Sequence, residues 1–175
     1  MENDVWSLIG SSSVSFMLSF MLMTAWLPFA PRRAGEVLLR VPLGFVQRLL
    51  VHRAKAIVML AIVVILSALG PLAFGRELLI PGTPAIALAG FVAILMLPMA
   101  YVFTDRGVGI NNGVPRTYKS FRRFDVRLGK RWARDTATIV LHGRKTDKGT
   151  TPSHALYVPV PAQPDVVRLL KKHVR

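Results

Sequence analysis

The sequence predicts an α+β membrane protein in which three transmembrane helices precede a small, basic, antiparallel β domain that ends in a helix. Hydrophobic residues make up 52% of the 175 residues and charged residues only 18%, which is too apolar for an ordinary soluble domain. Positive charge is unevenly placed: residues 104–175 carry sixteen Lys or Arg and five Asp, a net +11, against +3 for residues 1–103. Period-two alternation of apolar residues, which is typical of strands, begins only after Phe103.

Three apolar runs define the expected membrane domain, residues 1–103. Each approaches the roughly 20 residues that a helix needs to cross the hydrocarbon core of a bilayer. The first run is not a typical secretory signal, because Glu2 and Asp4 precede it where a basic segment is usual. The predicted spans are residues 5–30, 54–74 and 84–103.

Small residues recur every fourth position in two of these spans, which places them on one face of each helix. Such faces let another helix approach closely, and serine hydroxyls can bond across the contact. The other interpretation is that the serines bond only to carbonyls of their own helix. We expect packing against another helix, either within the chain or on another membrane-protein subunit, through Ser7, Ser11, Ser15, Ser19, Ala85, Ala89 and Ala93.

The connection over residues 31–53 is rich in arginine and is opposed only by Glu36. Its apolar residues stand at helical spacing beside basic and polar residues, which predicts a basic amphipathic helix on the membrane surface. Because Lys and Arg beside the spans favour the cytoplasm, we expect the N-terminus outside the cell and residues 104–175 inside, in a multi-pass protein of the cell (inner) membrane. The arginines of this surface helix are Arg32, Arg33, Arg40, Arg48 and Arg53.

After Phe103 the pattern predicts an antiparallel sheet closed by one helix. Asn111, Asn112 and Gly113 are typical of a tight turn. The helix begins at Pro164 and Asp165 and places Val167, Leu170 and Val174 on one face. The strand-like apolar sets are Val108 with Ile110; Phe124, Val126 and Leu128; Ala137, Ile139 and Leu141; and Leu156, Val158 and Val160.

The order of these features resembles the bacterial pleckstrin-homology-like (PH-like) domains, which often follow transmembrane helices. The resemblance covers residues 101–174 and rests on Tyr-Val-Phe-Thr-Asp-Arg-Gly-Val-Gly-Ile-Asn-Asn-Gly from Tyr101, the strand that ends in Val-Pro-Val-Pro, and Pro-Asp-Val-Val-Arg-Leu-Leu from Pro164. It implies a small β-sandwich or partly open barrel with a C-terminal helix. It also implies adaptor or scaffold work rather than catalysis.

The most pronounced chemical feature is a basic run with aromatic residues among its cations. A tethered domain of this charge can bind anionic lipid headgroups, an acidic surface of a protein partner or, with the aromatics stacking on bases, nucleic acid. A face that only keeps the domain soluble is the remaining alternative. We expect lipid or protein docking, and consider nucleic acid the weaker interpretation. The run comprises Arg116, Lys119, Arg122, Arg123, Arg127, Lys130, Arg131 and Arg134, with Tyr118, Phe121, Phe124 and Trp132 between them.

No motif for catalysis or cofactor binding occurs in the sequence. There is no cysteine, no P-loop and no His-Glu-x-x-His spacing, and two histidines that flank a polar loop, His142 and His154, are too few for a metal site. The sequence thus predicts a non-enzymatic accessory or scaffold subunit without metal, cofactor or small-molecule substrate. The competing class is a non-catalytic component of a membrane enzyme or transporter whose active groups lie on another chain.

Overall fold

The computed structural model describes residues 2–26, 35–74, 79–111, 115–129, 133–146, 149–150 and 152–174. The chain divides into two compact units. The helical unit contains Met1–Trp26 and His52–Leu97, and the sheet domain contains Leu27–Val51 and Pro98–Arg175. The sheet domain is therefore assembled from two separate parts of the chain.

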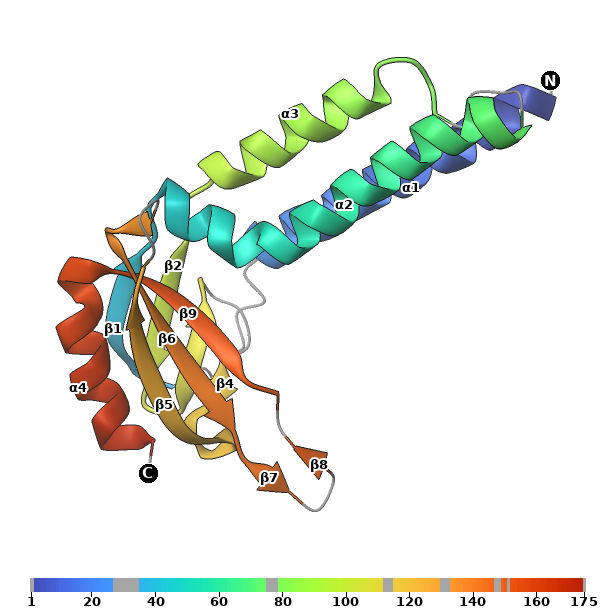
Figure 1. The fold of residues 1–175 in the computed structure, drawn as a ribbon. Coiled ribbons are helices and arrows are strands. Elements are labelled where there is room, and N and C mark those ends of the chain that lie inside the picture. Colours follow the sequence, from blue (N-terminus) through green and yellow to red (C-terminus); the bar gives the residue numbers. More distant parts are fainter. Residues whose placement is uncertain are drawn as a thin grey trace. The chain divides into compact units, whose positions relative to one another are not determined.

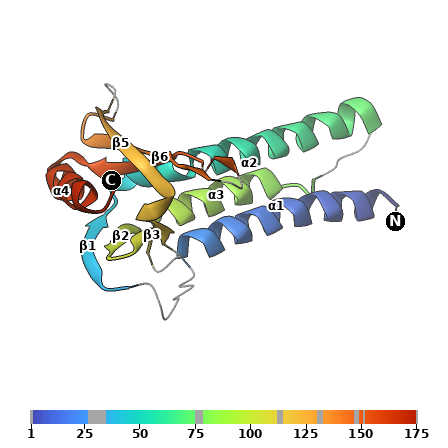
Figure 2. The same cartoon turned by 90° about the horizontal axis from the view of Figure 1, so that it is seen from below.

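Three helices run side by side in the helical unit (Figures 1 and 2). They are α1 (Glu2–Trp26), α2 (Phe45–Phe74), whose first residues belong to the sheet domain, and α3 (Thr83–Met96). A small apolar core of Val14, Val63, Leu79 and Ala87 holds them together. Most other large apolar side chains described on these helices are exposed, as expected for helices that meet lipid or further protein.

The prediction of three transmembrane helices is wrong. Within the described ranges, only residues 45–68, in α2, are long and apolar enough to cross a membrane. The third predicted span fails because Pro98 disfavours helical geometry at Leu97, which is extended with φ −64° and ψ 141°. What remains is α3, whose 14 residues measure only about 21 Å, and a strand that begins at Ala100.

α1 is a continuous helix where the first span was expected, but it is not among the candidate membrane helices. The second span was placed correctly but begins earlier than residue 54, since α2 already starts at Phe45. The structure is therefore an α+β fold in which one apolar helix of spanning length lies among the described residues.

The sheet domain contains two antiparallel sheets, a short ribbon and one helix (Figure 1). Its four-stranded sheet has the order β1-β2-β3-β4, its three-stranded sheet has the order β5-β6-β9, and β7 pairs with β8. The bounds are β1 Val37–Pro42, β2 Ala100–Thr104, β3 Gly107–Ile110, β4 Arg116–Thr117, β5 Phe121–Leu128, β6 Thr136–Gly143, β7 Lys145–Thr146, β8 Gly149–Thr150, β9 His154–Pro159 and α4 Gln163–His173.

The region expected to form a surface helix contributes a strand instead. β1 pairs antiparallel with β2, and Arg40 lies opposite Val102. Val41 is buried in this sheet. Only the end of the expected surface helix is helical, since Arg48 and Arg53 lie on α2, whereas Arg32 and Arg33 lie outside the described residues. A run of Val, Leu and Leu before Arg40 suits a strand whose partner comes much later in the chain.

The predicted strand patterns of the second sheet are confirmed. Ala137, Ile139 and Leu141 on β6 are fully buried, as are Leu156 and Val158 on β9. Val160, the last residue of that predicted set, instead begins a short 3₁₀ helix after β9. Register shifts between Phe121 and Arg123 in the β5–β6 pairing, which is typical of a β-bulge. The shift explains how Phe121 and Phe124, three residues apart, can both face the core. The C-terminal helix is also confirmed, with Leu170 fully buried and Val174 buried just beyond its end. The predicted face is wrong at one position, because Val166 is fully buried and Val167 is only half-buried.

Two buried hydrogen bonds join parts of the sheet domain that are distant in sequence. The Tyr157 backbone N–H on β9 donates to the Tyr101 hydroxyl on β2 at 3.2 Å, which ties the two sheets together. Gln47 Nε2, on the first turn of α2, donates to Thr136 Oγ1 on β6 at 2.7 Å. The second bond joins the two parts of the sheet domain that are separated in sequence by residues 52–97.

The β2–β3 turn, in the stretch that connects the two halves of the chain, depends on Thr104 and Gly107. The buried Thr104 hydroxyl accepts from the Arg106 and Gly107 backbone N–H groups and donates to the Gly107 carbonyl. A Cβ on Gly107 would lie 2.0 Å from the Arg116 carbonyl oxygen on β4. Close backbone approach therefore requires glycine here.

Candidate docking surface

The basic run lies on β4, on the short 3₁₀ turn Tyr118–Ser120, on β5 and just before β6. Of its eight cations, Lys130 and Arg131 lie outside the described residues. The other six are all exposed. We call them the basic surface, and they are Arg116, Lys119, Arg122, Arg123, Arg127 and Arg134.

The aromatic residues interleaved in sequence do not accompany these cations to the surface. Tyr118 and Phe121 are buried in the core of the sheet domain, and Phe124 is half-buried. Trp132 lies outside the described residues. Stacking on bases needs exposed rings beside cations. The buried rings of Tyr118 and Phe121 cannot stack in this way, which weakens the nucleic-acid interpretation.

The outer face of β5, away from the core, carries Arg123, Asp125 and Arg127. The β5–β6 register places them opposite His142, Val140 and Thr138 respectively. Asp125 Oδ2 lies 2.6 Å from His142 Nε2, and both side chains are partly exposed. This pair is not evident from the sequence, because it depends on the strand register.

The two histidines that flank the polar loop do not face each other. His154, on β9, lies opposite Leu141 of β6 and so shares its face of the sheet. His142 is the next residue of β6 and lies opposite Arg123 of β5. Because neighbouring residues of a strand point to opposite faces, the two histidine rings lie on opposite faces of the sheet. Burial, and then the nearby Arg116 guanidinium, lower the pKa of His154. Within the described residues no cluster of three or more His, Cys, Asp or Glu is placed to bind a metal.

Tyr118 stacks on His173 near the end of α4, with ring centroids 4.9 Å apart and planes inclined by 24°. Neither the Tyr118 hydroxyl nor His173 Nε2 has a hydrogen-bond partner among the described residues, although both atoms are buried. Burial and then the charge of Asp105 raise the pKa of Tyr118, so its phenol is neutral. The contact fastens α4 to the turn that precedes β5.

In the helical unit, one of the predicted serines packs as expected. The Ser11 hydroxyl lies 3.0 Å from Thr83 Oγ1 of α3 and accepts from the Ile80 backbone N–H at 2.9 Å. Ser15 and Ser19 instead donate to carbonyls one turn earlier in their own helix, and Ser7 is half-buried. Ser11 therefore packs against another part of the chain, as expected, whereas Ser15 and Ser19 bond to carbonyls of their own helix.

The alanine stripe of α3 does not form the contact within the chain. Ala85, Ala89 and Ala93 are exposed, and the buried residues of α3 include Thr83 and Ala87 instead. Gly90 allows close approach to α1, since a Cβ there would lie 3.2 Å from Leu18. Packing of the alanine stripe against another subunit stays a prediction.

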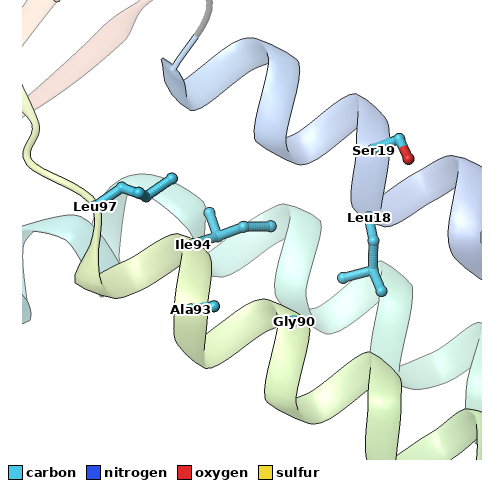
Figure 3. Close-up of a pocket in the computed structure, with 6 residues that line it drawn as sticks. All are labelled: Leu18, Ser19, Gly90, Ala93, Ile94 and Leu97. Carbon is cyan, nitrogen blue, oxygen red and sulfur yellow. The ribbon is translucent and has the colours of Figure 1, made fainter.

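A shallow apolar hollow of about 300 Å³ lies between α1 and α3 (Figure 3). Its lining residues are Leu18, Ser19, Gly90, Ala93, Ile94 and Leu97. The single hydroxyl among them, on Ser19, already donates to the Ser15 carbonyl. With no other polar side chain in its lining, the hollow offers nothing to orient a substrate.

Comparison with protein-family models, curated proteins and solved structures found no match to this chain. The interpretation of its surfaces therefore depends on the geometry described above.

Proposed function

We propose that this chain is a non-enzymatic membrane adaptor whose sheet domain binds anionic lipid headgroups through the basic surface. The observation that carries the proposal is the separation of the cations from the aromatic rings that stand among them in the sequence. All six described cations of the run are exposed, while Tyr118 and Phe121 are buried. This arrangement favours electrostatic attraction over base stacking.

The helical unit supports membrane attachment. Residues 45–68 of α2 are of spanning length, and most of their side chains are not buried within the chain itself. Lipid would cover this apolar surface. The PH-like resemblance of residues 101–174 is the further reason to propose adaptor work.

The excess of Lys and Arg supports a cytoplasmic sheet domain, because the cytoplasmic leaflet carries anionic lipids. Each cation near that surface contributes about 1 kcal/mol, so several acting together would hold a tethered domain. An N-terminus outside the cell is not part of the proposal, since that prediction followed from three crossings.

The test uses the full chain, because a fragment of residues 104–175 would lack β1 and Gln47. Thr117, exposed on β4, is changed to Cys and labelled, which is specific because the chain has no other cysteine. Energy transfer from this label to acceptor headgroups is then measured in nanodiscs. We expect higher transfer with anionic than with neutral lipid, and a decrease as salt rises.

Charge reversal identifies the surface that is responsible. Arg116→Glu, Lys119→Glu and Arg122→Glu together should abolish the difference between anionic and neutral lipid. Lys171→Glu with Lys172→Glu, on exposed positions of α4, is the control and should retain most of it. Equal transfer in both lipids would refute lipid docking. Salt-sensitive capture of RNA by the same chain would then favour the nucleic-acid alternative.

A further inference from the structure

β5 is an edge strand with an open apolar face. Within the described part of the chain it pairs only with β6. The register places Phe124, Val126 and Leu128 on the same face as Leu141, Ile139 and Ala137, which are fully buried. Yet Val126 is 37% exposed and Leu128 is 72% exposed. The core face therefore continues beyond β6 to an edge where nothing described covers it.

An unpaired edge of this kind is usually protected by charges that discourage pairing with another strand. The charges of β5 are arranged differently. Residues 124–128 read Phe-Asp-Val-Arg-Leu, so one acidic and one basic residue stand on either side of the central Val126. The segment has the same pattern of apolar residues in both directions, with its charges exchanged.

We propose that β5 pairs antiparallel with β5 of a second copy of this chain, with the two-fold axis at Val126. In this register Val126 faces its own counterpart and Leu128 faces Phe124 of the other copy, which covers the exposed apolar face. Asp125 faces Arg127 twice, once on each side of the axis. Opposite charges at directly facing positions stabilise antiparallel pairs. The result is one continuous six-stranded sheet with isologous contacts.

Neighbouring registers are less suitable. A two-fold axis at Asp125 would oppose two Asp125 side chains and place Arg123 against Arg127, and an axis at Arg127 would oppose two arginines. An axis at Phe124 would pair Val126 with Arg122, within the register shift between Phe121 and Arg123. Only the axis at Val126 matches both charges and apolar groups outside the shift. Asp125 keeps one oxygen available, since His142 contacts only Oδ2.

Cysteine cross-linking of the full chain in membranes tests the geometry. Facing residues of an antiparallel pair have Cα atoms about 4.5–5.5 Å apart, within the range of a disulfide. Val126→Cys, the only cysteine in the variant chain, should therefore form a disulfide-linked dimer under mild oxidation. Leu128→Cys is the control, because its two copies would lie about 13 Å apart along the strands. Equal cross-linking at both positions, or none at Val126→Cys, overturns the proposal.

Charge variants of the cysteine-free chain provide an independent readout, by native mass spectrometry. Asp125→Lys and Arg127→Glu each create two like-charge pairs, and we expect each to raise the dimer dissociation constant on the order of tenfold. Mixing the two variants should restore pairing as a heterodimer. The introduced lysine of one chain then faces the introduced glutamate of the other, and the unchanged Arg127 faces the unchanged Asp125. Arg123→Glu, the same charge change outside the paired segment, should leave the dimer intact.

Three outcomes of the charge series overturn the proposal: a wild-type monomer, failure of the mixture to form heterodimers, and equal loss with Arg123→Glu. Binding of an acidic partner protein to β5, without self-association, would also overturn the proposal, because the partner and not a second copy would then cover this edge. Headgroup binding and dimerisation are distinguishable, because salt should abolish the first while cross-linking at Val126→Cys persists.

Discussion

The hydrogen bond between Gln47 and Thr136 offers the most direct test of how the first turn of α2 is bound within the sheet domain. Gln47 Nε2 donates to Thr136 Oγ1 at 2.7 Å, and the two residues are only 6% and 1% exposed. Thr136→Val removes the hydroxyl and keeps nearly the same shape. The Gln47 amide then stays buried without this acceptor, and water cannot easily replace it.

The expected cost follows from that burial. Leaving a buried donor unsatisfied costs about 1–3 kcal/mol, whereas a surface change usually costs about 0.5 kcal/mol or less. Hydrogen exchange of the full chain, followed by mass spectrometry, reports this locally. We expect amides of β6 and β9 to exchange roughly 5–150-fold faster in Thr136→Val. Thr138→Val, on the same strand but only half-buried, is the matched control and should change exchange little.

A double variant separates this mechanism from a general loss of packing. Gln47→Met removes the buried donor, so Gln47→Met with Thr136→Val leaves no unsatisfied group at either position. If the two single effects were independent, their free-energy costs would add in the double variant. We expect the double variant to exchange more slowly than that sum predicts, and therefore more like the wild type. Strict additivity would refute the reasoning, as would an equal effect of Thr138→Val.

Three further predictions concern other parts of the fold. Ser11→Ala should lower the stability of the helical unit by about 1–3 kcal/mol, whereas Ser15→Ala, which loses only a bond within its helix, should cost a few tenths; thermal unfolding in detergent compares them. Gly107→Ala should destabilise the sheet domain by about 1–3 kcal/mol or more in denaturant unfolding, because its Cβ would meet the Arg116 carbonyl. Since the folded-state pKa of His154 is lowered below 6.5, the sheet domain should lose stability as pH falls below about 6.5, and His154→Gln should remove that slope. A wild-type stability that does not change between pH 7 and 5 would contradict this last prediction.

Local patterns in the second half of the sequence predicted its strands well. The alternation of Ala137, Ile139 and Leu141 is visible because one face of β6 is buried in the core. The helix after Pro164 was equally clear from its spacing and charge. The faces of β5 were also predicted correctly, but not the exposure of Leu128, because the position of a strand at the edge of a sheet depends on its partners.

The errors arose where apolar runs had two interpretations. A continuous run through Ala100 to Phe103 suits both a membrane helix and a buried strand, and period alone does not distinguish them. The strand β1 was missed because its partner β2 lies far along the chain and because Arg40 and neighbouring arginines suggested a surface helix. The Asp125–His142 pair was missed for the same reason, since register is a property of two strands.

The pairing of β1 with β2 also restricts membrane topology. Residues 43–99 leave the four-stranded sheet after Pro42 and return to it at Ala100, on the strand that pairs with the one they left. A hydrogen-bonded pair of strands cannot lie on both sides of a bilayer. If α2 passes through a membrane, the chain must therefore cross back before Ala100, and the number of crossings between the two strands is even. A single-pass protein with α2 alone in the bilayer is incompatible with this sheet.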